Sequence, residues 1–163
     1  MSNLIKERIE TISKMEQKFE QKDVSFFVSL LRHKDRVIRI RALSALEVIG
    51  DQSVVQEIGR VLLEDEDPVV RHEAAFVLGQ LGYKSALPYL ERAVLEDPAP
   101  IVRHESAVAI GVIGDQSSRK TLEKVMNSDA EEIVRFSAEI ALTNLEFLRE
   151  TRTSSRFSKI VGG

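Results

Sequence analysis

The sequence predicts an all-α protein, a short α-solenoid of about four two-helix repeats with an extra helix at the N-terminus. First, arginines recur at a constant interval of 32 residues, at Arg39, Arg71, Arg103 and Arg135. Second, each arginine follows two apolar residues and precedes a stretch rich in small apolar residues. Third, no segment keeps the two-residue alternation of a strand. Two helices in each 32-residue interval are typical of solenoids, in which each repeat packs on its neighbours.

Composition is that of a soluble globular protein. The 163 residues make one domain, with 43% hydrophobic and 30% charged residues. The sequence has no cysteine, which excludes disulfides, zinc–thiolate sites and cysteine nucleophiles. No apolar run approaches the roughly 18–20 residues that cross a bilayer, and the first twenty residues do not resemble a secretory signal. We therefore expect a cytoplasmic protein with no membrane partner.

Charge is distributed unevenly along the chain. The net charge is −3, although residues 149–163 carry four basic residues against one acidic residue. The rest of the chain is therefore acidic, which argues against nucleic acid and favours a cationic substrate or partner.

Residues 1–20 are expected to form a helix that has no counterpart in the repeats. Ile5, Ile9, Ile12, Met15 and Phe19 follow one another at spacings of three or four and make one apolar stripe. Such a helix either caps the end of the stack or serves in oligomerisation.

Residues 21–148 are expected to hold the repeats. The first helix of a repeat is predicted to open at a serine N-cap, at Ser53, Ser85 or Ser117. The second begins after a cap such as Asp67, followed by Pro68 at the first helical position. Its predicted buried stripe is Val70, Ala74, Val77, Leu78 and Leu81. Gly50, Gly82 and Gly114 are predicted to end these helices in the left-handed conformation. Residues 149–163 are expected to be a flexible basic tail.

Two His-Glu dipeptides stand out because the same run, Val-Arg-His-Glu, occurs in both central repeats. His72-Glu73 and His104-Glu105 are 32 residues apart, whereas the outer repeats have Ile40-Arg41 and Phe136-Ser137 there. His72 is about 200° around the helix axis from Ala74, so it points away from the core. We expect both dipeptides to face one groove, where Gly79 and Gly111 leave room. His33 is interpreted separately, as a cation at a helix C-terminus.

Two histidines and a carboxylate on neighbouring helices could bind one metal ion, as in sites with two His and one carboxylate. The other interpretation from the residues alone is that duplication copied a solvated surface dipeptide.

The repeat pattern resembles the HEAT-like repeats found in phycobilin lyases, over residues 21–146. The run from Val70 to Leu81, followed by Ala86–Leu90 and Val102–Glu105, resembles more specifically one half of deoxyhypusine hydroxylase. That family is a HEAT-repeat monooxygenase of two similar halves, in which four His-Glu motifs hold two irons and a modified lysine on a protein is hydroxylated.

The resemblance implies iron ligands at His72, His104 and Glu105, with Glu73 as a further ligand or as the catalytic residue that meets the substrate amine. This chain has two motifs where the family has four. The resemblance therefore implies a homodimer with one iron per chain, which restores the di-iron centre across a two-fold axis.

Two alternatives belong to other functional classes. The first is a metal-free scaffold that binds a partner protein in its concave groove. The second is a lyase-like or chaperone subunit for tetrapyrroles, which rests on the repeat type alone. Because the chain has no cysteine, it cannot itself hold a tetrapyrrole through a thioether.

Overall fold

The computed structural model describes residues 2–151, and within them every regular element is helical. The α-helices are α1 Asn3–Glu20, α2 Val24–Leu30, α3 Arg36–Ile49, α4 Val55–Glu64, α5 Pro68–Leu81, α6 Leu87–Glu96, α7 Pro100–Ile113, α8 Arg119–Ser128 and α9 Glu132–Thr151. Short 3-10 turns at Gln52–Val54, Lys84–Ala86 and Gln116–Ser118 precede α4, α6 and α8. The predicted all-α solenoid is confirmed.

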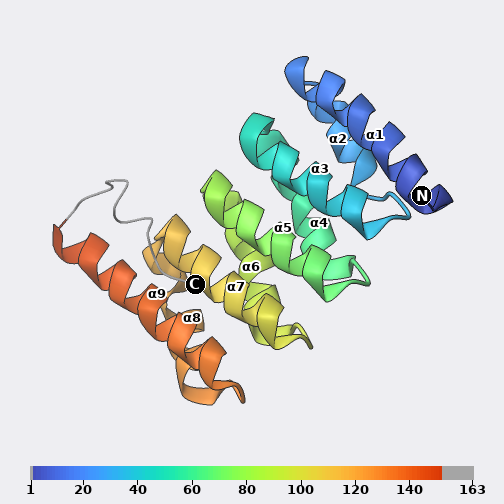
Figure 1. Cartoon of the computed structure of the whole chain (residues 1–163). Coiled ribbons are helices and arrows are strands. Elements are labelled where there is room, and N and C mark those ends of the chain that lie inside the picture. The colour runs from blue at the N-terminus through green and yellow to red at the C-terminus, as the bar shows by residue number, and fades with distance from the viewer. Residues whose placement is uncertain (1, 152–163) are drawn as a thin grey trace.

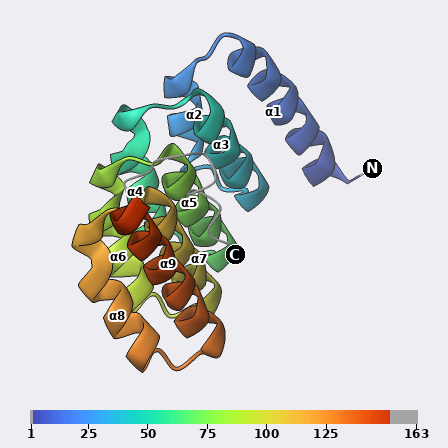
Figure 2. The same cartoon turned by 90° about the vertical axis from the view of Figure 1, so that its left-hand side faces the viewer.

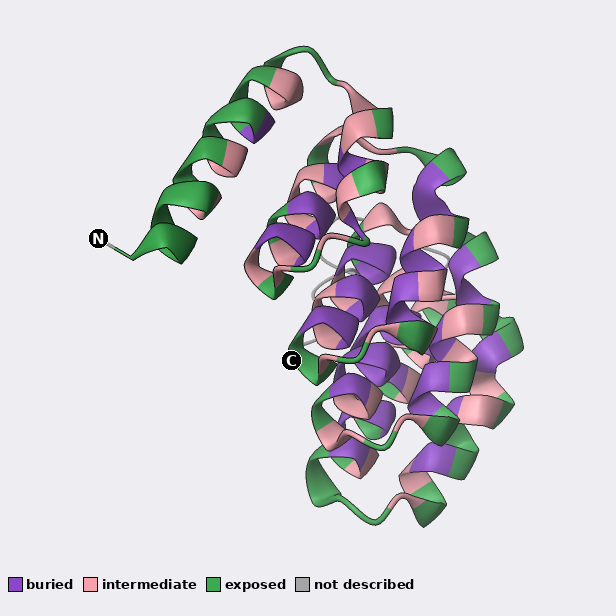
Figure 3. Ribbon diagram, turned by 90° about the vertical axis from the view of Figure 1, so that its right-hand side faces the viewer, coloured by how far each residue is buried: buried purple, intermediate pink, exposed green. Residues whose placement is uncertain are grey.

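The helices form two layers, with the odd-numbered helices in one and the even-numbered helices behind them (Figure 1). Helix α5 packs between α3 and α7, and α7 packs between α5 and α9. The residues coloured as buried gather where the two layers meet (Figure 3). Four of the five residues predicted as the buried stripe of α5 are completely buried, Val70, Ala74, Val77 and Leu78. The core therefore uses the faces that the sequence periodicity indicates.

The repeating arginine is a structural tie between successive repeats. Arg71 donates from Nε to Asp97 at 2.7 Å and from Nη1 to the Asp65 carbonyl at 2.8 Å. Arg39 and Asp65, and Arg103 and Asp129, form the same carboxylate pair in the flanking repeats. Arg39, Arg71 and Arg103 thus each join the start of one repeat's second helix to the end of the next repeat's first helix. The arginine recurs for this structural reason.

Helix α5 begins as predicted, but the first helices of the repeats do not. The Asp67 side chain accepts from the Val69 N–H, and Pro68 occupies the first turn of α5. The prediction of serine N-caps is wrong. Ser53 lies inside a 3-10 turn, whose cap is Asp51, and the Asp51 side chain accepts from the Ser53 N–H at 2.8 Å. Asp51, and not Ser53, caps this turn because the Asp51 side chain comes two residues before the amide N–H that needs an acceptor.

The three glycines that follow second helices are not equivalent. Gly82 and Gly114 have φ of +73° and +71°, which is the predicted left-handed conformation. Gly50 has φ of −81°, so the prediction is wrong there. A Cβ at Gly50 would lie 2.4 Å from the Leu46 carbonyl oxygen. Glycine is therefore required at this position for space and not for a left-handed backbone.

Helix α1 extends outward from the odd-numbered layer at the N-terminal end of the stack (Figure 2). Met15 is its buried anchor, while Ile5 and Ile9 are exposed. Near its start, Arg8 forms two hydrogen bonds with Asp35, the N-cap of α3. Between α1 and α3 is a largely apolar cleft of about 730 Å³.

The C-terminal boundary differs slightly from the expected position of the tail. Helix α9 continues through Thr151, three residues beyond the predicted end of the repeats. The remainder of the predicted flexible tail, residues 152–163, lies outside the described residues. Over residues 2–151, no helix combines the length and the apolar character that a bilayer crossing requires.

Candidate functional site

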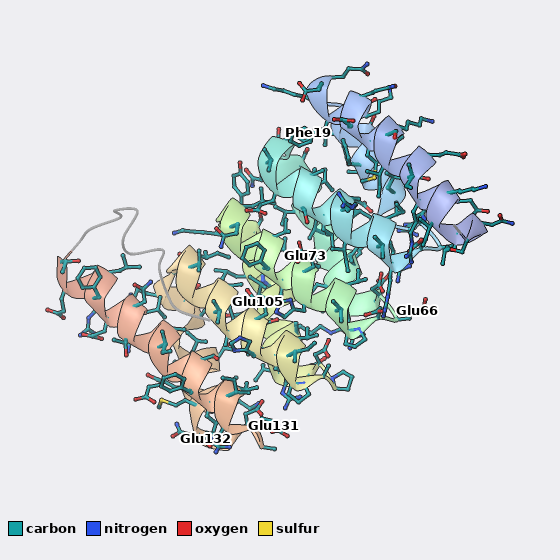
Figure 4. All side chains as sticks on the ribbon, viewed as in Figure 1. Phe19, Glu66, Glu73, Glu105, Glu131 and Glu132 are labelled. Atoms are coloured by element: carbon teal, nitrogen blue, oxygen red, sulfur yellow. The ribbon has the colours of Figure 1, made fainter. Side chains whose placement is uncertain are left out.

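The two His-Glu dipeptides lie on adjacent helices of the odd-numbered layer, His72-Glu73 on α5 and His104-Glu105 on α7. Glu73 and Glu105 are shown on these helices in Figure 4. Their positions differ in depth, because Glu105 belongs to the buried part of α7 whereas His72, Glu73 and His104 are half-buried. His72 and His104 are thus both more exposed than the buried stripe residues of their helices.

His72 and Glu105 meet across the gap between α5 and α7. The His72 Nε2 atom is 3.3 Å from Oε2 of Glu105, whose side chain is only 10% exposed. The hydrogen bond that His72 donates to Glu105 raises the pKa of the His72 imidazole; burial partly opposes this shift, and the charges of Glu105 and Glu73 reinforce it. The pair is therefore a charge-assisted contact between a buried carboxylate and a half-exposed imidazole.

His104 has a neutral partner. Its Nδ1 atom lies 2.6 Å from the hydroxyl of Ser137 on α9, and that hydroxyl also donates to the Ile133 carbonyl at 2.7 Å. Burial lowers the pKa of the His104 imidazole, and the nearby His72 lowers it further, against an opposing effect of Glu105. Folding therefore favours the neutral ring at His104.

Glu73 is directed toward α3, on the other side of α5. Its Oε1 atom accepts from the Ser44 hydroxyl at 2.8 Å. Burial raises the pKa of the nearby Glu47 carboxyl, and the charge of Glu73 raises it further. Glu73 and Glu47 thus form a second acidic position, one helix removed from the contact between His72 and Glu105.

The contacts follow one rule of register. His72 contacts residue 105 and His104 contacts residue 137, and each partner lies 33 residues further along the chain, on the next odd-numbered helix. In both cases, the histidine contacts the residue directly after the position that aligns with it in the next repeat. The partner is Glu105 in one case and Ser137 in the other.

The fit to a metal ion is partial. Ligand atoms bound at 2.0–2.2 Å to one ion are separated by about 3.0–3.5 Å, and the separation of 3.3 Å between His72 and Glu105 falls in that range. In the part of the chain that the structure describes, however, no three His, Cys, Asp or Glu side chains are gathered closely enough to hold an ion. Of the predicted metal-binding residues, only His72 and Glu105 lie at such a separation, and His104 lies on the same helix as Glu105.

One predicted detail of the surroundings is wrong. Gly79 leaves no open room, because a Cβ there would be 2.8 Å from the Ala109 Cβ of α7. The carbonyl of Gly111 accepts a hydrogen bond from the Asn144 side chain of α9. Gly79 therefore allows close packing of α5 against α7. Close packing is also what brings α7 near enough to α5 for Glu105 to meet His72.

His33 has a different role from the predicted helix-end cation. Its Nδ1 accepts from the Asp35 N–H at 3.0 Å. Asp65 occupies the equivalent position one repeat later, and its Oδ1 accepts from the Asp67 N–H. His33 thus replaces a capping aspartate of the repeat, a role that the alignment of the repeats could have indicated.

Three polar residues of the site were missed by the sequence reasoning: Ser44, Glu47 and Ser137. Residue 137 aligns with Glu73 and Glu105, so repeat alignment combined with the 33-residue register could have found it. Ser44 and Glu47 carry no such sequence signal.

The comparisons with known proteins agree with this architecture. The family of HEAT repeats matches residues 24–107 and, in an overlapping placement, residues 57–143. A solved structure of human deoxyhypusine hydroxylase in complex with glycerol is similar to this chain, with a TM-score of 0.75 and 27% sequence identity. The similarity covers 86% of this chain and 49% of that chain, so this chain spans about half the length of that enzyme. No curated protein matches the sequence. The resemblance to one half of deoxyhypusine hydroxylase is confirmed.

Proposed function

We propose a metal-dependent function for this chain, on the premise that the chain belongs to the family of HEAT-repeat proteins. In this proposal His72, His104 and Glu105 hold an iron ion, and the protein has oxygenase chemistry similar to that of deoxyhypusine hydroxylase. The observation that carries the proposal is the contact between His72 and Glu105, at the separation of two ligands on one ion. Bound iron with open coordination positions would supply the activation of dioxygen.

The proposed substrate is a lysine-derived or other cationic group, on a protein that carries a modified lysine. Glu73 is the proposed catalytic residue that meets this group, because it lies beside His72 in the chain and presents a carboxylate held by Ser44. Glu47 adds acidic character beside Glu73. An ammonium group is attracted to such a pair of carboxylates, and an anionic substrate is repelled by it.

A homodimer is part of the proposal. The chain spans about half of the deoxyhypusine hydroxylase chain, and it carries two His-Glu motifs. A second copy related by a two-fold axis would bring two further motifs and a second iron. Isologous dimers are the commonest closed assembly of identical chains. The site is thus proposed to be complete only when two copies combine.

Metal content and solution mass, measured on protein purified without chelator, test this function. We expect about one iron per chain and the mass of a dimer. His72→Ala, His104→Ala and Glu105→Ala should each lose the iron. His33→Ala is the matched control, because His33 is the only other histidine and lies at a repeat boundary. Iron-free wild-type protein would contradict the metal site, and a monomer at micromolar concentration would contradict the shared di-iron centre.

A metal-free interaction scaffold is the second candidate, favoured by the cleft between α1 and α3. Ile12, Met15 and Phe19 line it from α1, and Ile40 and Ala45 line it from α3. An apolar cleft of this size suits the apolar face of a partner. If the wild-type protein binds no metal and a Phe19→Ala variant loses a partner that Glu73→Ala retains, the scaffold is the better interpretation.

A further inference from the structure

We propose that Ser137 is a positioning residue that fixes His104 in a single tautomer, with the proton on Nδ1 and the lone pair on Nε2. The two residues lie on different helices, His104 on α7 and Ser137 on α9, and they meet at 2.6 Å. Within residues 2–151, the Nε2 atom of His104 has no hydrogen-bond partner. Nε2 is thus the nitrogen left available for chemistry.

The direction of the hydrogen bond follows from the number of protons. A serine hydroxyl has one proton, and the Ser137 hydroxyl lies 2.7 Å from the Ile133 carbonyl oxygen. A carbonyl oxygen only accepts, so the hydroxyl proton must be directed to Ile133. Otherwise two oxygen lone pairs would face each other at that distance. The proton in the contact with Nδ1 therefore comes from His104.

Burial keeps this arrangement in place. Ser137 is 2% exposed, so water does not compete for its hydroxyl. The hydroxyl is held on its own helix by the bond to the carbonyl four residues earlier. A buried hydroxyl that lost one of these partners would leave a polar group unsatisfied, at a cost of about 1–3 kcal/mol. The hydroxyl therefore presents a fixed acceptor to the imidazole.

Ser44 is also a serine close to the carbonyl four residues earlier, but it donates its hydroxyl proton to a side chain, whereas Ser137 accepts one. Its hydroxyl also lies near the carbonyl four residues earlier, that of Ile40, at 3.1 Å. Its other partner is the Glu73 carboxylate at 2.8 Å, which only accepts when ionised. Both partners of Ser44 are acceptors, and its proton is directed to Glu73, the nearer and charged one, whereas Ser137 accepts from His104. Ser44 is for this reason a matched control for Ser137.

The consequence for metal binding rests on the proposed function. An imidazole binds a metal through a nitrogen that carries no proton, and the hydrogen bond at the other nitrogen decides which one that is. With Nδ1–H directed to Ser137, the neutral His104 ring has its lone pair on Nε2 before any ion arrives. The tautomer itself is independent of metal and can be tested without it.

The test is nitrogen NMR of the imidazoles in metal-free, ¹⁵N-labelled protein at about pH 8, above the ordinary imidazole pKa. The three histidines are assigned with His33→Gln and His72→Gln variants. We expect His104 to give a pyrrole-type Nδ1 and a pyridine-type Nε2 signal. Ser137→Ala should shift this population toward the other tautomer or a mixture, while Ser137→Thr restores it and Ser44→Ala leaves it unchanged.

A wild-type His104 with its proton on Nε2 overturns the proposal, whatever the Ser137 variants show. An unchanged tautomer in folded Ser137→Ala protein also overturns it. Iron affinity is measured separately on the same proteins, with a loss of about 10- to 100-fold expected for Ser137→Ala. If the tautomer is as expected and no protein binds iron, the metal function fails and the assignment of Ser137 remains.

Discussion

The repeats that contain α5 and α7 share the run Val-Arg-His-Glu, yet they place its histidine in opposite environments. His72 of α5 faces a carboxylate, whereas His104 of α7 faces a hydroxyl. As a result, the pKa of His72 is raised and the pKa of His104 is lowered. Identical dipeptides thus differ because the next helix differs, and a repeat protein can diversify a site without changing the repeated motif.

The glutamates differ in the same way. Glu105 is buried and meets His72 of the preceding repeat, while Glu73 is half-buried and meets Ser44 of the preceding repeat. Each glutamate reaches backward and each histidine reaches forward. The site is therefore assembled between repeats, and neither repeat holds it alone.

The largest expected effect concerns what the two repeats have in common. Leu78 of α5 and Ile110 of α7 are equivalent and completely buried. Leu78→Ala and Ile110→Ala should each lower the free energy of unfolding by about 2–5 kcal/mol, from lost burial and the cavity left behind. Urea denaturation measures it. A loss below about 1 kcal/mol in only one variant would show that the two repeats are not packed alike.

The next largest effect is a difference in stability between variants of Glu105 and of Glu73. Glu105→Ala should cost about 1.5–3 kcal/mol near pH 6, because it removes a buried carboxylate that accepts a hydrogen bond from a charged His72. Glu73→Ala should cost less, about 0.5–1.5 kcal/mol, because its bond is to a neutral hydroxyl. Urea denaturation of both metal-free variants in one buffer provides the comparison. Equal losses of unfolding free energy in the two variants would contradict the difference between the partners of Glu105 and Glu73.

A smaller effect tests the spacing between α5 and α7. Gly79→Ala places a methyl group 2.8 Å from the Ala109 Cβ and 2.9 Å from its Cα. Overpacking of this kind costs about 1–3 kcal/mol. Moving the helices apart should also weaken the contact between His72 and Glu105, so the pKa of His72 should return toward its ordinary value. Proton NMR titration of metal-free protein measures this, and an unchanged pKa in a destabilised variant would count against the link.

The smallest effect is the dependence of stability on pH. The raised pKa of His72 stabilises the fold fully below the ordinary value of 6.5, and this contribution is lost as the pH rises through the raised folded value. The lowered pKa of His104 acts in the opposite direction. Its penalty is absent above 6.5 and grows as the pH falls through the lowered folded value.

Metal-free His72→Gln protein should therefore lose more stability at about pH 5.5 than at about pH 8, and His104→Gln should lose less at the lower pH. Both differences should be below about 1 kcal/mol, because these half-exposed groups are screened by solvent. Urea denaturation at the two pH values measures them. If the stability losses of the two variants change with pH in the same direction, the proposed distinction between His72 and His104 is wrong.

Sequence reasoning predicted the helices well and their junctions less well. The apolar period of α5 and its Asp67-Pro68 start are local features, so they can be inferred from the residues. The starts of the first helices were misjudged because Asp51 and Ser53 compete for the same turn. Gly50 was misjudged because its need for space depends on the Leu46 carbonyl and the Val54 side chain. Such competition is decided by three-dimensional geometry.

By itself, the sequence determined the 32-residue period, the two layers of helices that follow from it, and the fact that His72 and His104 point away from the core. These follow from the helical period, which fixes the direction of a side chain on its own helix. Only the tertiary structure decided that His72 meets Glu105 while His104 meets Ser137. Both pairs depend on the rotation and separation of neighbouring helices and not on the spacing of residues along one helix. For His72 and Glu105, the separation of α5 and α7 is set by packing around Gly79 and Ala109.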